Sequence, residues 1–419
     1  MRGRPLLFTS YQSDQSLLNT LTKRVVLGAF LLLLVALPFT GGGGPGNERL
    51  FDFRLPFIGF LGADDWLLLL GTVCIYAIGA LGLNILTGLA GQVSLGHAFF
   101  MGVGAYTAAW LGHPEGPLLG LGLPIWVWLP AAGLVAAVVG VLIGPTAVRV
   151  RGLYLAIVTL GLVFIGEYVF RNWRSLTGGS QAGRTFPRLE VRFWREEEAV
   201  ISAVNDGTWL TSNGKGFLFL LVLLVIFTLL AKNLQRTRVG RAFQSIRDRD
   251  VAAEVMGVNE FRYKLLAFGI SSFYAGVAGA LLAANFGRTI PERWNLLLSV
   301  QFIAIILIGG AGTVSGTLMG SAFVILLPRI VQNFTQWLKG VIDGGGWFAT
   351  LVDPVISTGA GDFGIVNIQP GVAPGLSLIQ ANQVIYGLLI IGFLIFEPLG
   401  LYGIWLRIRN YWKGWPFTY

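Results

Sequence analysis

Few side chains in this sequence could carry out covalent or metal chemistry. Cys74 is the single cysteine, and His97 and His113 are the only histidines in 419 residues, so neither a disulfide framework nor a zinc site of clustered Cys and His is expected. The run 178–185 nearly matches a phosphate-binding P-loop, but Arg184 stands where that loop requires Lys, and no strand is expected before it. The sequence therefore predicts no catalytic residue, no metal site and no bound cofactor.

Glu167 is the clearest ionisable residue inside an apolar run. A carboxylate in a membrane is costly and often functional, as in proton relays. Arg171 follows four residues later, one helical turn away, where the two side chains can form an ion pair. We favour this structural pair, although a proton-coupled role for Glu167 stays open.

The composition places most of the chain in lipid. Hydrophobic residues make up 54% and charged residues only 12%, against about 25% charged residues in an ordinary soluble protein. The net charge of +9 comes from basic residues scattered between apolar runs, not from one basic patch. Orientation in a membrane explains these charges better than nucleic acid binding, so lipid is expected as a partner and nucleic acid is not.

The apolar runs predict an all-α polytopic membrane protein with about ten transmembrane or re-entrant helices. A helix needs about 20 apolar residues to cross a bilayer, and shorter runs fit tilted or broken segments. The runs lie near residues 25–39, 66–87, 93–111, 124–143, 153–170, 216–231, 265–286, 296–308, 317–331 and 384–396.

Lys and Arg between the runs suggest an orientation with both termini in the cytoplasm. We interpret residues 1–419 as a single transmembrane domain with a cytoplasmic N-terminal segment, 1–24. Residues 171–215 and 332–382 are expected as outer loops, and 232–264 as a cytoplasmic loop.

Two segments resemble each other: residues 86–94 match 307–315 at six of nine positions, as L-x-G-x-A-G-x-V-S. Six expected spans separate them, which predicts two parallel-oriented repeats. Irregular backbone at membrane depth is tolerated where it lines protein or a water-filled cavity, so each copy could be a broken helix on a translocation path. The alternative is a tight turn between helices at the membrane face. The candidate path residues are Gly88, Gly91, Gln92, Ser94, His97, Gly309, Gly310, Gly312 and Ser315.

The loop 232–264 is the most charged segment of the chain. Asp250 is suited to be the N-cap and Gly257 the C′ residue of a helix of about two turns. If helix extends upstream, Phe243, Ile246, Ala253 and Met256 would share an apolar side. Such a short rigid helix could dock into a partner's groove, whereas the alternative is a solvated loop.

Several motifs resemble one family in the same order along the chain. The similar segments are 82–98, 175–180, 241–258, 308–316 and 396–403. They look like the permease subunits, of the M type, of bacterial ABC importers for branched-chain amino acids. The resemblance covers most of the chain and is specific for the family but not for the solute.

The resemblance implies a permease in the bacterial inner membrane, paired with a homologous permease. It further implies two cytoplasmic ATPase subunits, which hydrolyse ATP, and a periplasmic or extracellular solute-binding protein. Segment 241–258 would be the coupling helix, and its expected ATPase contacts are Arg247, Asp248, Asp250, Ala252, Ala253, Glu254 and Gly257. General ABC importers carry E-A-A-x3-G here; Val251 replaces the Glu, which puts a carboxylate contact at that position in doubt.

The sequence therefore predicts a transport subunit for a small neutral or zwitterionic solute. Branched-chain amino acids are expected first, and urea or short amides, carried by near relatives, stay open. A proton- or sodium-driven secondary transporter is the alternative of another class, but it would need paired acids or a defined ion site in the membrane.

Overall fold

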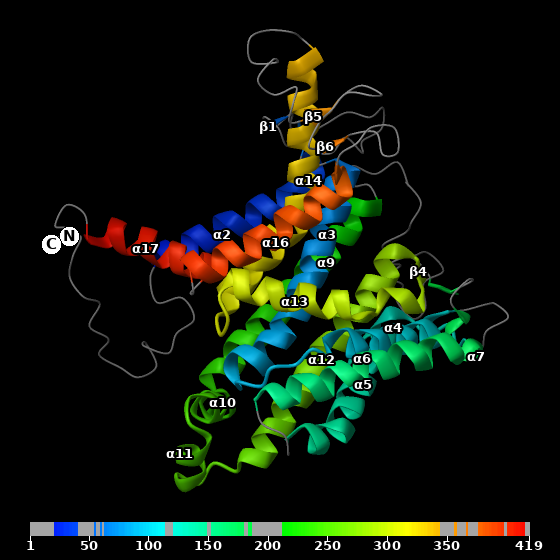
Figure 1. The fold of residues 1–419 in the computed structure, drawn as a ribbon, viewed down its shortest axis with the longest axis vertical. Helices are drawn as coiled ribbons and strands as arrows, with labels where there is room; N and C mark the ends of the chain where they lie inside the picture. Colours follow the sequence, from blue (N-terminus) through cyan, green and yellow to red (C-terminus); the bar gives the residue numbers. More distant parts are fainter. Residues whose placement is uncertain are drawn as a thin grey trace.

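The computed structural model describes residues 21–40, 54–55, 59–60, 63–113, 120–148, 152–179, 183–186, 212–343, 356–357, 366–367, 376–397 and 400–414. Over these ranges the chain is almost entirely helical (Figure 1). Seven of the described helices are long and apolar enough to cross a bilayer: Asp64–Leu89, Ile125–Pro145, Tyr154–Asn172, Ser212–Arg236, Glu260–Phe286, Pro291–Gly309 and Val314–Phe334. The predicted all-α polytopic membrane fold is confirmed.

Every apolar run expected to span the membrane falls on a helix. The spanning candidates are α2 (Leu21–Ala36), α3 (Asp64–Leu83), α4 (His97–Gly112), α5 (Ile125–Val148), α6 (Leu153–Asn172), α9 (Ser212–Arg236), α12 (Glu260–Phe286), α13 (Leu296–Gly309), α14 (Val314–Asp343) and α16 (Leu378–Phe396). The exact number of spans and the two parallel repeats stay predictions.

Short elements join these helices. The helical ones are η1 (Leu37–Thr40), the π-helical turn η2 (Asn84–Leu89), α7 (Arg174–Thr177), α10 (Arg238–Asp248), α11 (Asp250–Val255), η3 (Pro291–Arg293) and α17 (Gly400–Gly414). The part of the chain that the structure describes has three small sheets: β1 (Arg54–Leu55) with β2 (Gly59–Phe60), β3 (Arg184–Thr185) with β4 (Arg288–Thr289), and β5 (Ile356–Ser357) with β6 (Val366–Asn367) and β7 (Leu376–Ser377). The first two sheets are antiparallel and the third is parallel.

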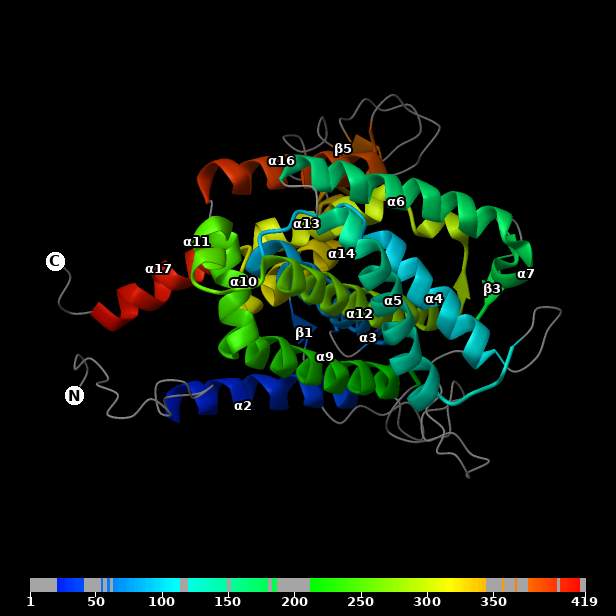
Figure 2. The ribbon, with the colours of Figure 1, turned by 90° about the horizontal axis from the view of Figure 1, so that it is seen from below.

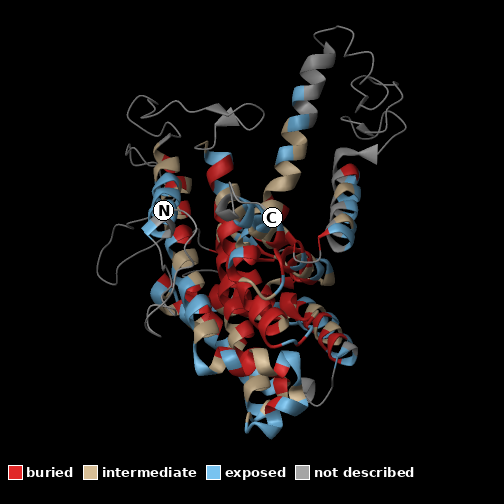
Figure 3. Cartoon of the chain, turned by 90° about the vertical axis from the view of Figure 1, so that its left-hand side faces the viewer, coloured by how far each residue is buried: buried red, intermediate tan, exposed pale blue. Residues whose placement is uncertain are grey.

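Helix α12 lies at the centre and packs against α3, α4 and α5 (Figure 2). Small residues make this contact close: a Cβ added to Gly104 of α4 would overlap the backbone of Gly276 on α12. Ser272, one turn earlier on α12, occupies the space above Gly140 of α5. Helices in lipid associate through such close backbone approach. Buried residues accordingly concentrate around this centre (Figure 3).

Helices α10 and α11 project from one end of the molecule (Figure 1). The side chain of Thr237 caps α10, accepting a hydrogen bond from the amide of Gly240 at 3.3 Å. Phe243 and Ile246 are buried on α10, which packs against α9 and α12, and the ring centre of Phe243 lies 6.4 Å from that of Tyr263 on α12. The end of α9 and the start of α12 hold this pair of short helices in place.

The helix expected in the loop 232–264 exists as α11, and its C-terminus is as predicted. Gly257 has a φ of 85° and its amide donates to the carbonyl of Glu254 at 2.9 Å. The amide of Val258 donates to the carbonyl of Ala253 at 3.0 Å, which completes a Schellman motif.

Two details predicted for this helix are wrong. The N-cap is Arg249, with φ −156° and ψ 102°, so Asp250 is the first helical residue and not the cap; its Oδ1 accepts from the amide of Val251 at 2.8 Å. Met256 is 85% exposed and does not join the apolar side formed by Phe243. Because the extended Arg249 separates α10 from α11, helical spacing does not carry across it.

The expected outer loops are only partly described. Residues 187–211 lie outside the described residues, as do 1–20 of the N-terminal segment. Of the segment 332–382, residues 332–343 continue α14 and 378–382 belong to α16. Helix α17, near the C-terminus, was not anticipated as a helix.

Candidate functional site

The two similar segments lie against each other. The side-chain Oδ1 of Asn84, in η2, accepts a hydrogen bond from the amide of Gly312 at 2.7 Å, and its Nδ2 donates to the carbonyl of Thr313 at 3.2 Å. Asn84 is 1% exposed, so both amide atoms depend on this pairing. Residues about 230 positions apart are thus joined by a single buried carboxamide.

Glycine is required where these backbones meet. A Cβ on Gly88 would collide with Asn84 Oδ1 and the amide of Gly312, and would lie 2.9 Å from Gly312 Cα. Gly312 has a φ of 82° and Gly91 a φ of 68°, values that residues with a side chain rarely adopt. The six-residue π turn before Gly91 widens the helix here, as π turns at functional sites often do.

Arg247, at the end of α10, closes over these glycines. Its Nη1 donates to the carbonyl of Gly88 at 2.9 Å, across 159 positions of sequence. A Cβ on Gly91 would lie 2.8 Å from Arg247 Cγ, so the stem of the arginine rests directly on that glycine. Asp248 orients the guanidinium, its Oδ1 accepting from Nε at 3.1 Å and from Nη2 at 3.0 Å.

Gln235, near the end of α9, completes the arrangement, since its Nε2 donates to the carbonyl of Gly312 at 3.4 Å. We define the glycine junction as Asn84, Gly88, Gly91, Gln235, Arg247 and Gly312. Its elements come from three distant parts of the sequence: η2, the consecutive helices α9 and α10, and the turn before α14. The arrangement can link a movement of α10 to two helix ends at once.

The other expected path residues lie around the junction without joining it. Ser94 is buried, and its Oγ accepts from the amide of Gly96 at 3.2 Å, shaping the start of α4. His97 is buried, and the centre of its ring lies 4.9 Å from the centre of the Phe302 ring. Gly309 packs against the backbone of Gly316 at the α13–α14 turn.

Three further path residues have different surroundings. Gln92 is 4% exposed, and both of its side-chain amide atoms are buried without a hydrogen-bond partner among the described residues. Gly310 caps α13 with φ 112°. Ser315, at the start of α14, is exposed.

The expected coupling residues divide by exposure. Ala253 is buried, whereas Ala252 and Glu254 are exposed on α11. Three apolar side chains that sequence reasoning did not select as contacts are strongly exposed on the same short element: Val251, Val255 and Met256, at 63%, 82% and 85%. We call these three residues the α11 apolar tip.

Sequence reasoning missed two members of the glycine junction, Asn84 and Gln235. An Asn inside an apolar run, one turn before Gly88, was the available signal, because a buried carboxamide must find partners. Nothing in the sequence marks Gln235, which sits among other polar residues at the end of α9.

Glu167 forms the predicted ion pair: its Oε1 lies 2.6 Å from Nη2 of Arg171. Glu292 of η3 adds a second carboxylate 3.6 Å from Nε of the same arginine. The Glu167 and Arg171 side chains are 23% and 48% exposed, so the pair lies at the surface of the chain and has the geometry of a structural contact.

Replacing Glu167 with Gln is therefore expected to change the free energy of unfolding by no more than about 1 kcal/mol, since exposed ion pairs contribute about 0–1 kcal/mol. Thermal unfolding of the purified protein in detergent would measure this change. A much larger loss of stability would show that Glu167 is more than one half of an exposed ion pair.

Residues 66–394 match a family model described as branched-chain amino acid transport system / permease component. The chain is 35% identical to the high-affinity branched-chain amino acid transport system permease protein LivM of Salmonella typhimurium over 64% of each chain. It is 32% identical to LivM of Escherichia coli over 78% of this chain and 72% of that protein.

More distant similarity is also found. The autoinducer 2 import system permease protein LsrC of Photorhabdus laumondii is 28% identical over 34% of this chain and 44% of its own length. No solved structure matches. Since the family model covers most of the sequence, the chain belongs to the family of branched-chain amino acid transport system permease components.

Proposed function

We propose that the chain is one permease subunit of an ATP-driven ABC importer and forms half of its translocation path. A homologous permease would form the other half, two cytoplasmic ATPase subunits would supply the work, and an external protein would deliver the solute. The family and the LivM relatives support this assignment. The observation that carries the mechanism is the bond from Arg247 to the carbonyl of Gly88, which connects α10 to the end of α3 and η2.

In this proposal α10 and α11 face the cytoplasm and both termini lie on that side. The α11 apolar tip is the contact for an ATPase subunit, because three exposed apolar side chains on a projecting element are typical of an interaction site. The extended Arg249 and the Schellman motif at Gly257 fix the direction in which the tip points.

The glycine junction then acts at the cytoplasmic end of the path. Movement of α11 pulls α10 and Arg247, and through them the carbonyl of Gly88 and the backbone at Gly312. Because the ATPases can shift the permease only by binding its two states differently, the junction must differ between those states. The unpartnered amide of Gln92, next to Gly91, is suited to gain a partner in the second state.

The solute is proposed to be a branched-chain amino acid, in keeping with the LivM relatives. Urea and short amides are the alternative within the same transport mechanism. Thermal-shift measurements of the external binding protein against amino acids, urea and amides would decide between them.

Replacing Val255 or Met256 with Asp is expected to reduce co-purification of the ATPase subunits at least about tenfold, since a charge placed in a desolvated apolar contact is strongly unfavourable. The fold should be unaffected because both side chains are exposed. Quantitative pull-down from detergent-solubilised membranes is the measurement. Arg262→Ala is the control: Arg262 is exposed at the start of α12, outside the α11 apolar tip, and its replacement should retain the ATPases. Full ATPase recovery with both Asp variants would refute the proposed contact.

A further inference from the structure

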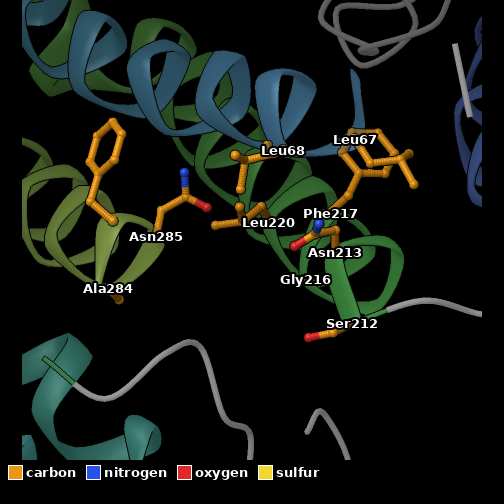
Figure 4. Close-up of a pocket in the computed structure, with 11 residues that line it drawn as sticks. Leu67, Leu68, Ser212, Asn213, Gly216, Phe217, Leu220, Ala284 and Asn285 are labelled. Carbon is orange, nitrogen blue, oxygen red and sulfur yellow. The ribbon is translucent and has the colours of Figure 1, made fainter. Parts of the chain in front are cut away.

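A cavity of about 330 Å³ lies between α3, α9 and α12 (Figure 4). Its walls come from the first two turns of α3, the first turns of α9 and the last turn of α12. The lining residues are Leu67, Leu68, Gly71, Ser212, Asn213, Gly216, Phe217, Leu220, Ala284, Asn285 and Phe286. Leu68 and Phe286 are 43% and 50% exposed, so the cavity reaches the surface of the chain.

The cavity lies far from the glycine junction. Helix α9 runs from the cavity at Ser212 to Arg236, beside α10, and its 25 residues span about 37 Å at about 1.5 Å per residue. Helix α12 likewise begins after α11 and ends at the cavity. If α10 and α11 face the cytoplasm, the cavity opens at the outer end of the chain.

The lining has the composition of a site for a small, partly apolar molecule. Five of the eleven lining residues are leucine or phenylalanine, polar groups share the surface with them, and none of these described lining residues is ionised. A molecule with a net charge would therefore enter without a counter-charge, which is unfavourable. Binding pockets for small molecules typically measure about 300–1,000 Å³, so this one suits a ligand at the small end of that range.

Two carboxamides supply the polar contacts. Asn285 is held by Thr72, whose Oγ1 accepts from its Nδ2 at 3.2 Å, and Thr72 Oγ1 in turn donates to the carbonyl of Leu68 at 2.9 Å. This leaves the Asn285 carbonyl oxygen oriented by a fixed network. Asn213 lies across the cavity on α9 (Figure 4). A carboxamide can accept from an ammonium group and donate to a carboxylate.

We propose that this cavity binds an α-amino acid with an aliphatic side chain at the outer end of the permease. The ammonium and carboxylate groups meet the carboxamides of Asn285 and Asn213, and the aliphatic side chain lies against Leu67, Phe217 and Leu220. The proposal rests on the proposed import function and extends it by assigning the outer solute site within this subunit.

Gly216→Leu tests the site by filling it. Gly216 lines the cavity, and a Cβ added there meets no atom of the described residues within 4 Å, so the position has room for a larger side chain. Gly161→Leu is the matched control: Gly161 also has no atom within 4 Å of its added Cβ, but it lies on α6, away from the cavity. The complete transporter, with partner permease, ATPases and binding protein, is reconstituted in proteoliposomes, and uptake of leucine and alanine is measured with ATP.

Filling the cavity is expected to lower leucine uptake about tenfold while alanine uptake falls less than about threefold, because a shortened pocket discriminates by the size of the aliphatic group. Gly161→Leu should behave as wild type for both amino acids. Asn213→Leu, which removes one carboxamide, should raise the KM for leucine without changing the leucine-to-alanine preference.

Equal losses for leucine and alanine in Gly216→Leu, or no loss, would overturn the site. So would an unchanged KM in Asn213→Leu. These results differ from failure of the proposed function, in which the wild-type complex itself would show no ATP-dependent amino acid uptake.

Discussion

Replacing Gly88 with Ala is expected to destabilise the permease by about 2–6 kcal/mol, a large effect for a single methyl group. The added Cβ would overlap Asn84 Oδ1 and the Gly312 amide, and Gly312 can move away only by giving up its hydrogen bonds to Asn84 and Gln235. Overpacking accounts for about 1–3 kcal/mol, and loss of the buried Asn84–Gly312 hydrogen bond leaves two unsatisfied groups that account for the rest.

Thermal unfolding of the purified protein in detergent measures this effect. Gly161→Ala is the control, since its Cβ meets no atom and the change should be neutral or slightly stabilising by up to about 1 kcal/mol. If Gly88→Ala unfolds at the wild-type temperature, the two similar segments do not pack as closely as described.

Replacing Arg247 with Ala is expected to uncouple ATP hydrolysis from uptake. A hydrogen bond from a charged donor contributes about 1.5–3 kcal/mol. If this energy links the state of the ATPases to the state of the permease, its loss changes the equilibrium between the two permease states by roughly 10- to 150-fold. Arg247 is partly exposed and outside the central core, so the protein should still fold and bind its ATPases. Solute uptake should therefore fall at least about tenfold while ATP hydrolysis continues.

The measurement is the number of solute molecules taken up per ATP hydrolysed in proteoliposomes. Arg249→Ala removes an exposed arginine two residues away and should keep the wild-type ratio. Arg247→Lys keeps the positive charge but not the planar set of N–H donors, so its ratio of solute uptake to ATP hydrolysis should lie between those of Arg247→Ala and wild type. A wild-type ratio in Arg247→Ala would mean that the bond to Gly88 has no part in coupling.

Much of the fold could be predicted from the sequence, because the membrane imposes simple rules. A helix satisfies its own backbone in lipid, so each long apolar run had to become a helix, and the runs at 66–87 and 265–286 did so within a few residues. The end of α11 at Gly257 could also be predicted, because a glycine in the C′ position ends a helix through hydrogen bonds to neighbouring residues only.

The candidate site could be predicted only in parts. The matching nine-residue segments indicate Gly88 and Gly312, and the family resemblance indicates Arg247 as part of the coupling helix, yet nothing in their spacing brings them together. Their contact depends on how α3, α10 and α14 pack, across 159 and more positions of sequence. Long-range contacts of this kind follow from tertiary packing, which a local pattern does not contain.

The errors around α11 have a local cause. Helical spacing from Phe243 placed Met256 on the apolar side only if the helix were continuous, and the extended Arg249 interrupts it. Because of this interruption, Met256 is exposed in the α11 apolar tip instead of packing beside Phe243, and it is therefore available for contact with a partner.

Cross-linking from the α11 apolar tip tests the central claim most directly. Val255→Cys, in a background with Cys74 replaced by Ala, is treated with a short bifunctional thiol reagent in native membranes containing the whole transporter, with Leu297→Cys on α13 as an exposed control. The account predicts an adduct between position 255 and an ATPase subunit whose yield changes when ATP is bound, and none from position 297. No ATPase adduct from position 255, with or without nucleotide, would contradict it.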